Sequence, residues 1–194
     1  MLKLYVVRHG QSETNLAGLY CGWGQVSLTE KGFADAAKAG ELLKDIAFEK
    51  VYASDLLRAI QTCQTALPDV AFEQTPLLRE VSVGSLFGMT RAQAMEMYGD
   101  IHRQRLSARD FTAYCGENTQ MQYDRIAEFM ESLEKADLDG NVAVFCHEGT
   151  VKCMLSYVLQ AKIPWNRYLV DNGAVSVFIW DGKVWKLQSW NMTR

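Results

Sequence analysis

Short apolar runs alternate along the chain with longer stretches in which apolar and polar residues are mixed. The runs are three to five residues long and rich in Val, Phe and Tyr, which is typical of strands buried in a sheet. Four runs predict strands: residues 4–7, 51–53, 70–72 and 142–146. The first strand is expected to end at Arg8.

The longer stretches between these runs carry apolar residues at helical spacing. Such spacing, with Ser, Thr or Asp at the start, predicts amphipathic helices with side-chain caps. The predicted helices are Thr29 to about Ile46, a helix capped by Ser54 or Asp55, residues 90–135 with breaks at Gly99 and 115–116, and a helix from about Gly149.

The end of the sequence has the pattern of a hairpin. Residues 175–180 and 184–190 flank Asp181-Gly182, a dipeptide that favours tight turns between antiparallel strands. Strands that alternate with helices indicate an α/β fold of three layers, with a mostly parallel central sheet and helices on both faces. The hairpin would form an antiparallel edge, and residues 88–117 are expected to form a small helical cap over one end of the sheet.

Composition narrows the class of protein. A chain of 194 residues fits one domain, residues 1–194. The net charge of −3 without a Lys/Arg-rich run argues against nucleic-acid binding, and no apolar stretch approaches the ~18 residues of a membrane span. Five Cys without Cys-x-x-Cys spacing suit reduced thiols in a cytoplasmic protein. The oligomeric state stays open.

Two of the three histidines directly follow predicted strands. Arg8-His9 comes after the first apolar run, and His147 comes after the run 142–146. Because open α/β sheets bind ligands at the carboxyl ends of strands, we expect His9 and His147 to share one site. The third histidine, His102, lies in an amphipathic stretch and is expected on the surface.

Arg58 stands in the first turn of a predicted helix, where the helix dipole favours acidic residues. Such a local inconsistency favours a functional site. With Arg8 and the helix N-terminus, Arg58 would form a pocket for phosphate. The histidines alone fit metal binding, core packing or phosphate chemistry, but the spacing of His and Cys gives little support to a zinc site. A histidine flanked by arginine suits nucleophilic attack on phosphorus.

Glu80 is the candidate proton donor. It lies in a stretch of strand-like or irregular character, after residues 77–79. A partly buried carboxyl group with a raised pKa can protonate a leaving alkoxide at neutral pH. We therefore expect the pKa of Glu80 to be raised.

Six short motifs occur in order along the chain: residues 8–15 (RHGQSETN), 27–32, 54–62, 78–88, 116–125 and 146–149. Together they resemble the motifs of the histidine phosphatase superfamily, the phosphoglycerate-mutase-like proteins. The resemblance covers nearly the whole chain. Within that family, the chain looks like the small phosphatases, such as α-ribazole phosphatase and the broad-specificity phosphatases.

This resemblance implies a phosphomonoesterase that acts on a small-molecule phosphate monoester. His9 would be the nucleophile and become phosphohistidine, and Glu80 would act first as general acid and then as general base. His147 would be catalytic and would also bind the phosphoryl group. The other residues implied to bind it are Arg8, Asn15 and Arg58. No metal and no other cofactor is implied.

Glu148 departs from the family pattern because it stands where the family has a glycine whose N–H commonly faces the phosphate. We predict that Glu148 belongs to the phosphate site, with its carboxylate pointing either into the pocket or to solvent. Cys21, Gly22 and Trp23 are predicted to bind the rest of the substrate, whose identity stays open.

Two other functions fit the same residues. A phosphoglycerate-type mutase would use the same fold, although such mutases are usually longer and carry Trp where this chain has Thr14. A degenerate member would bind phosphate or a protein without turnover, and only Glu148 supports that reading. The phosphatase is the preferred interpretation.

Overall fold

The computed structural model describes residues 1–136 and 138–194, and within them a six-stranded sheet runs in the order β3-β2-β4-β1-β5-β6. Strands β3, β2, β4 and β1 are parallel, while β5 and β6 form an antiparallel edge. The strands are β1 (Leu2–Arg8), β2 (Lys50–Ser54), β3 (Glu73–Thr75), β4 (Asn141–Cys146), β5 (Val175–Trp180) and β6 (Trp185–Met192). The predicted α/β fold is confirmed.

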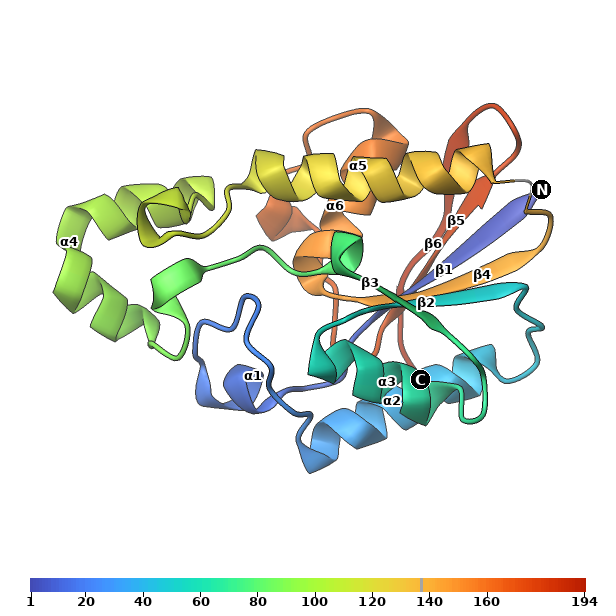
Figure 1. Cartoon of the computed structure of the whole chain (residues 1–194), viewed down its shortest axis with the longest axis horizontal. Helices are drawn as coiled ribbons and strands as arrows, with labels where there is room; N and C mark the ends of the chain where they lie inside the picture. The colour runs from blue at the N-terminus through green and yellow to red at the C-terminus, as the bar shows by residue number, and fades with distance from the viewer. Residues whose placement is uncertain (137) are drawn as a thin grey trace.

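Helices cover both faces of the sheet (Figure 1). One layer holds α2 (Glu30–Leu43) and α3 (Leu57–Ala66), and the other holds α5 (Thr119–Lys135) and α6 (Glu148–Leu159). Leu4 and Val6 of β1 pack into the core beneath α5 and α6, whereas Val7 packs into the core beneath α2 and α3. Burial on both faces explains why β1 reads as a continuous apolar run.

Helix α4 (Arg91–Ala108) lies beyond the carboxyl ends of the parallel strands, near α1 (Glu13–Ala17) (Figure 1). Gly99 interrupts α4 with a non-helical backbone, as the sequence predicted. Short 3-10 helices span Pro76–Leu78, Gly84–Leu86, Thr112–Tyr114 and Trp165–Arg167. No helix of the described residues is both long and apolar enough to cross a membrane.

The expectation that His102 lies on the surface is wrong. His102 is fully buried, and the hydroxyl groups of Tyr20 and Tyr114 each lie 3.1 Å from one of its ring nitrogens. The region around α4 has a small apolar core of its own, separate from the two cores on the faces of the sheet. The buried side of α4 faces this cluster.

The predicted cap of α3 is also wrong, although Thr29 caps α2 as expected. Leu56 is the N-cap of α3 and provides no side-chain hydrogen bond. The Ser54 hydroxyl instead contacts His147, and the Asp55 carboxylate binds Arg79. Both polar side chains therefore bind distant partners, and neither is the N-cap residue of α3.

Two strand predictions need correction. Residues 70–72 are not a strand, because the chain is still turning after α3, with Asp69 in the left-handed region (φ 66°), and β3 begins only at Glu73. The hairpin is present, but its closing pair is Trp180 with Trp185. The loop therefore spans residues 181–184, and Asp181 Oδ1 accepts the N–H groups of Lys183 and Val184.

Candidate active site

His9 and His147 meet at the carboxyl ends of two neighbouring parallel strands. His9 follows β1 and His147 follows β4, and these strands pair with Arg8 opposite Cys146. The two imidazole rings lie 5.1 Å apart, edge to face. The structure thus brings together the two histidines that the strand pattern placed at one end of the sheet.

The two ring nitrogens of His9 have different neighbours. Nδ1 lies 2.7 Å from the carbonyl oxygen of Gly10, so Nδ1 carries a proton and donates it. Burial, together with the positive charges of Arg58 and Arg8, holds the pKa of His9 well below its usual value. The ring is therefore neutral at neutral pH, and the lone pair on Nε2 is the reactive one.

Arg58 is almost fully buried beside His9, with Nε 3.3 Å from His9 Nε2. Its other nitrogens donate to two carbonyl oxygens of the loop after α1, at 2.9 Å from Gly22 and 3.0 Å from Gly24. Gly22, predicted to bind substrate, thus contacts Arg58 through its backbone. The fixed fork geometry of the guanidinium explains why an arginine suits this position.

His147 is fully buried, and its Nε2 lies 2.9 Å from the Ser54 hydroxyl. Among the described residues, its Nδ1 has no hydrogen-bond partner although it is buried. Burial, with the positive charge of Arg58, holds the pKa of His147 well below its usual value. When the Ser54 hydroxyl donates to Nε2, the proton resides on Nδ1, which is then a free donor in the site.

Arg8 and Glu148 lie next to each other at the rim of the site. Arg8 donates from Nη1 to the carbonyl oxygen of Val170, and its Nη2 lies 3.6 Å from Glu148 Oε2. Glu148 Oε1 accepts a hydrogen bond of 2.6 Å from Lys152. The Glu148 carboxylate is 40% exposed and lies between two cations, Arg8 and Lys152. This is a third position besides the two that the sequence left open.

Asn15 and Asn172 hold the backbone around His9. Asn15 Oδ1 accepts the Ser12 N–H at 3.2 Å and completes the N-terminal cap of α1. Asn172 Nδ2 donates to the His9 carbonyl oxygen at 3.0 Å and lies 3.4 Å from Asn15 Oδ1. Asn172 was not predicted from the sequence, because no local pattern relates residue 172 to the first strand.

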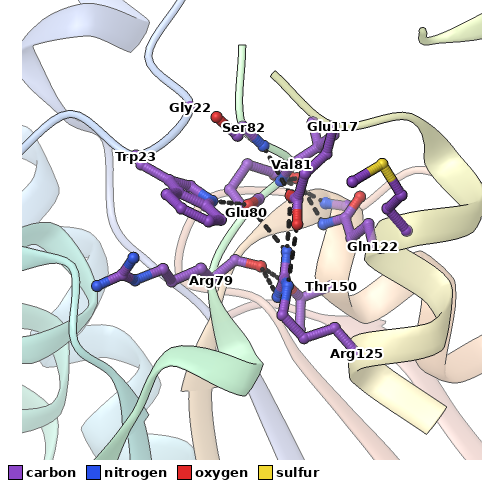
Figure 2. Close-up of polar contacts among 12 residues, drawn as sticks. Gly22, Trp23, Arg79, Glu80, Val81, Ser82, Glu117, Gln122, Arg125 and Thr150 are labelled. Carbon is purple, nitrogen blue, oxygen red and sulfur yellow. Dashed lines mark hydrogen bonds and ion pairs between the residues drawn. The ribbon is translucent and has the colours of Figure 1, made fainter. Parts of the chain in front are cut away.

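The Glu80 carboxylate accepts three hydrogen bonds, and Figure 2 shows two of their donors, Val81 and Gln122. Oε1 accepts from Val81 N–H (2.8 Å) and Gln122 Nε2 (2.9 Å), and Oε2 accepts from Gly149 N–H (2.9 Å). Burial raises the pKa of Glu80, but the charge of Arg109 and these three bonds lower it, and the pKa lies below its ordinary value. The predicted raised pKa is therefore wrong for this arrangement.

Arg125 fixes the backbone that carries Glu80 (Figure 2). Its guanidinium donates to the carbonyl oxygens of Leu77 (2.8 Å), Arg79 (3.0 Å) and Glu80 (3.3 Å). The Glu117 carboxylate binds the same guanidinium at 2.9 and 3.2 Å. The motif 116–125 contained both residues, but the sequence did not reveal that they support Glu80.

Trp23 supports the same segment from the opposite side. Its indole Nε1 donates to the Glu80 carbonyl oxygen at 2.7 Å (Figure 2). The Arg79 guanidinium lies 4.7 Å from the centre of the Trp23 ring and binds the Asp55 carboxylate with two hydrogen bonds, at 2.5 and 2.7 Å. The Cys21 thiol donates a weak hydrogen bond of 3.9 Å to the Gly24 carbonyl oxygen.

The chain belongs to the histidine phosphatase superfamily (branch 1), whose sequence profile matches residues 4–193. The 2,3-bisphosphoglycerate-dependent phosphoglycerate mutase 1 of Lactobacillus johnsonii is 33% identical over 193 residues, covering 81% of this chain and 84% of the mutase. Members of this superfamily include phosphatases and mutases, which supports an enzymatic function for this chain.

Solved structures show the same fold. A putative alpha-ribazole-5'-P phosphatase from Escherichia coli has a TM-score of 0.91 at 24% identity, with 99% of this chain and 98% of that one covered. Phosphoserine phosphatase from Entamoeba histolytica, in complex with 3-phosphoglyceric acid, has a TM-score of 0.83 at 25% identity, with 100% and 98% covered.

A metal site is not evident in the part of the chain that the structure describes, where no group of three or more His, Cys, Asp or Glu converges. The absence of a metal from the reaction stays a prediction.

Proposed function

We propose that the protein hydrolyses phosphate monoesters through a phosphohistidine at Nε2 of His9. The observation that carries this proposal is the state of His9: a neutral imidazole whose Nδ1–H is bound by Gly10 and whose Nε2 lies beside the Arg58 guanidinium. A nucleophile fixed in one tautomer next to a phosphate-binding cation is arranged for phosphoryl transfer.

In the first step, Nε2 of His9 forms a bond to phosphorus and the bond from phosphorus to the alcohol oxygen breaks. The Gly10 carbonyl stabilises the positive charge that develops on the imidazole through its hydrogen bond with Nδ1. Arg8, Arg58 and His147 bind the phosphoryl oxygens. Arg8 Nε and His147 Nδ1 are buried nitrogens without another partner in the described residues, which supports this role.

Glu80 protonates the departing alkoxide in that step. Its pKa lies below the usual value, but a phosphate dianion beside the carboxylate raises that pKa, since a nearby like charge disfavours ionisation. In the second step, Glu80 removes a proton from water, the water oxygen bonds to phosphorus, and the bond from Nε2 to phosphorus breaks. Inorganic phosphate and neutral His9 are the products.

The test is direct detection of the phosphoenzyme. After brief mixing with p-nitrophenyl phosphate and quenching, mass spectrometry should find one phosphoryl group on the peptide that contains His9, labile to acid. His9→Ala should fold normally, form no adduct and lose essentially all turnover. Substantial turnover by His9→Ala, or a phosphoryl group on another residue, contradicts the proposal.

A phosphoglycerate mutase is the second candidate, because relatives at 33% identity carry that name. The two activities separate with 3-phosphoglycerate as substrate, with and without 2,3-bisphosphoglycerate. A phosphatase releases inorganic phosphate in both cases, while a mutase forms 2-phosphoglycerate when the bisphosphate is present. A non-catalytic member gives neither product but still binds phosphate esters.

We also infer a cytoplasmic location, because the five cysteines are free thiols and three of them are buried. Reduced cysteines are the normal state in that compartment. Small phosphorylated metabolites are the partners that fit this location and this site. Fractionation of cells that express the protein at its native level tests the location.

A further inference from the structure

Gln122 is the only side chain, among the described residues, that donates a hydrogen bond to the Glu80 carboxylate. It lies on α5 and is fully buried, with its Nε2 2.9 Å from Glu80 Oε1 (Figure 2). The other two donors, from Val81 and Gly149, are backbone N–H groups. A substitution at residue 122 therefore removes one donor to Glu80 and leaves the other two in place.

The amide of Gln122 is satisfied at its nitrogen but not at its oxygen. Oε1 of Gln122 is buried and has no hydrogen-bond partner in the part of the chain that the structure describes. Burying an unpaired amide oxygen costs free energy, and an apolar side chain of similar size would fill the same space without that cost. The hydrogen bond from Nε2 to Glu80 is therefore what a glutamine supplies at this position and a methionine or leucine would not.

The start of α6 leaves room for this contact. A Cβ at residue 149 would lie 2.1 Å from Glu80 Oε1 and 2.8 Å from Gln122 Nε2. Because Gly149 has no side chain, the Gln122 amide and the Glu80 carboxylate can both pack against its backbone. The Gly149 N–H is then free to bind the second carboxylate oxygen, Oε2, at 2.9 Å.

The three donors are divided unequally between the two oxygens of Glu80. A carboxylate has about four acceptor sites, two on each oxygen. Val81 and Gln122 occupy both sites of Oε1. Of the described residues, Gly149 alone donates to Oε2. The fourth acceptor site, on Oε2, is thus the one left for a proton or for a group of the substrate.

The geometry points to Gln122 as a positioning residue that directs the exchangeable proton of Glu80 to Oε2. This inference rests on the proposed phosphatase function and assigns the two oxygens of its general acid. In the acid form, Oε1 is the carbonyl oxygen and keeps both of its N–H donors, while Oε2 carries the proton. The same three hydrogen bonds fit the acid and the carboxylate, so the transfer of the proton requires no rearrangement of the donors.

Both chemical steps then use the same oxygen of Glu80. In the first step, the proton passes from Oε2 to the alcohol oxygen while the bond from that oxygen to phosphorus breaks. In the second step, a proton of water returns to Oε2 while the water oxygen bonds to phosphorus and the bond from His9 Nε2 to phosphorus breaks. Without the Gln122 donor, a site on Oε1 becomes free, and a proton bound there faces residue 122 instead of the leaving group.

Gln122→Met tests the assignment, because methionine has a similar length and no N–H donor. For alkyl phosphates, kcat/KM should fall by about tenfold or more, the scale of one hydrogen bond to a charged group. For p-nitrophenyl phosphate, whose leaving group needs little protonation, it should change by less than about twofold. Across a series of phosphate esters, kcat/KM should therefore fall more steeply with the pKa of the leaving alcohol than in the wild type. Gln120→Met, at an exposed position of α5, is the matched control and should keep the wild-type dependence.

A double variant distinguishes an effect through Glu80 from a general effect on packing. If Gln122 acts through Glu80, Gln122→Met should cause no further loss in a Glu80→Gln background. Gln122→Glu keeps the length of the side chain but should also lose alkyl phosphate hydrolysis selectively, because two facing carboxyl groups hold a shared proton between them, at Oε1. Circular dichroism checks that each variant is folded, and Gln122→Glu supplies the same comparison if Gln122→Met does not fold.

The outcomes separate this inference from the proposed function. A folded Gln122→Met enzyme with the wild-type ratio of alkyl to p-nitrophenyl phosphate hydrolysis overturns the inference while the phosphatase function stands. An equal loss on both substrates, or a further loss in the Glu80→Gln background, overturns it in the same way. If the wild type hydrolyses no phosphate monoester, the phosphatase function fails, and the assignment of the Glu80 oxygens fails with it.

Discussion

At the scale of single residues, hydrogen bonds within the protein determine which atom of each side chain is left to contact a substrate. The Gly10 carbonyl occupies Nδ1 of His9 and the Ser54 hydroxyl occupies Nε2 of His147, so each histidine presents one chosen nitrogen. The two carbonyl oxygens bound to Arg58 fix its orientation in the same way. Hydrogen bonds to backbone carbonyls and to the Ser54 hydroxyl thus select the tautomer of each histidine and the orientation of Arg58.

The role of Glu80 predicts a dependence on the leaving group. Glu80→Gln keeps the size of the side chain but cannot deliver a proton, so kcat/KM for alkyl phosphates should fall by about 10²- to 10⁴-fold. For p-nitrophenyl phosphate, whose leaving group needs little protonation, the loss should be far smaller. Steady-state kinetics on both substrates measures the difference.

Glu96→Gln, at an exposed position of α4, is the control and should leave both substrates unaffected. An equal loss on alkyl and p-nitrophenyl phosphates in the phosphorylation step would mean that Glu80 does not act as the proton donor.

At the scale of elements, the segment that bears Glu80 is not a strand or a helix but is held by its neighbours. Arg125 of α5 binds its carbonyl oxygens, the Trp23 indole donates to the Glu80 carbonyl oxygen as well, and Thr150 of α6 donates to the Arg79 carbonyl at 3.1 Å. Three separate parts of the chain therefore meet at this irregular stretch. Such support gives an irregular segment the rigidity that a reacting group needs.

The contact between Glu80 and the start of α6 predicts that Gly149→Ala is damaging. A Cβ at residue 149 would lie 2.1 Å from Glu80 Oε1, so the carboxylate must move away from the N–H group that binds it. We expect kcat/KM to fall by about 10²-fold, since small displacements of a reacting group have effects of that order. A Cβ at residue 140 would lie 3.3 Å from Glu49 Oε2, the end of a flexible side chain, so Gly140→Ala serves as the control.

Circular dichroism and thermal unfolding should show that both variants stay folded. A Gly149→Ala enzyme with wild-type kinetics on alkyl phosphates would show that the position of the Glu80 carboxylate does not matter for turnover.

The sequence predicted the elements whose signals are local. The apolar runs of β1 and β4 and the polar residues that directly follow them placed His9 and His147 together, because parallel strands end at the same edge. Long-range contacts had no such signal. Gly149 lies 69 residues from Glu80 in the chain, and the donors from Gln122 and Arg125 come from another helix. The pKa of Glu80 is lowered by the charge of Arg109 and by the hydrogen bonds from Gly149, Val81 and Gln122. Most of these contacts are distant in the sequence, and so the direction of the shift was predicted wrongly.

At the scale of the whole molecule, the buried histidines link stability to pH. Burial holds the pKa of His9 and of His147 well below the usual value, so both are neutral in the folded protein. The unfolded chain, with ordinary pKa values near 6.5, binds more protons as the pH falls below that value. The free energy of unfolding should therefore be highest above about pH 7 and should decrease as the pH falls towards pH 5.

The expected slope is up to about 1.4 kcal/mol per pH unit for each buried histidine in that window. Urea unfolding between about pH 7.5 and pH 5 measures how the free energy of unfolding changes with pH. His9→Ala should lower this slope by the contribution of one histidine. A stability that is constant across this range would contradict the neutral state of the buried rings.

Glu148 gives Arg8 a negative partner that belongs to the chain itself. A phosphate that reaches Arg8 therefore replaces one acidic group with another and does not meet an uncompensated cation. The general attraction of the site for anions is reduced, and shape and hydrogen bonding count for more in what is bound. One residue at the start of α6 can thus shift the protein from attracting many anions to choosing among them, while the histidines and arginines of the site stay in place.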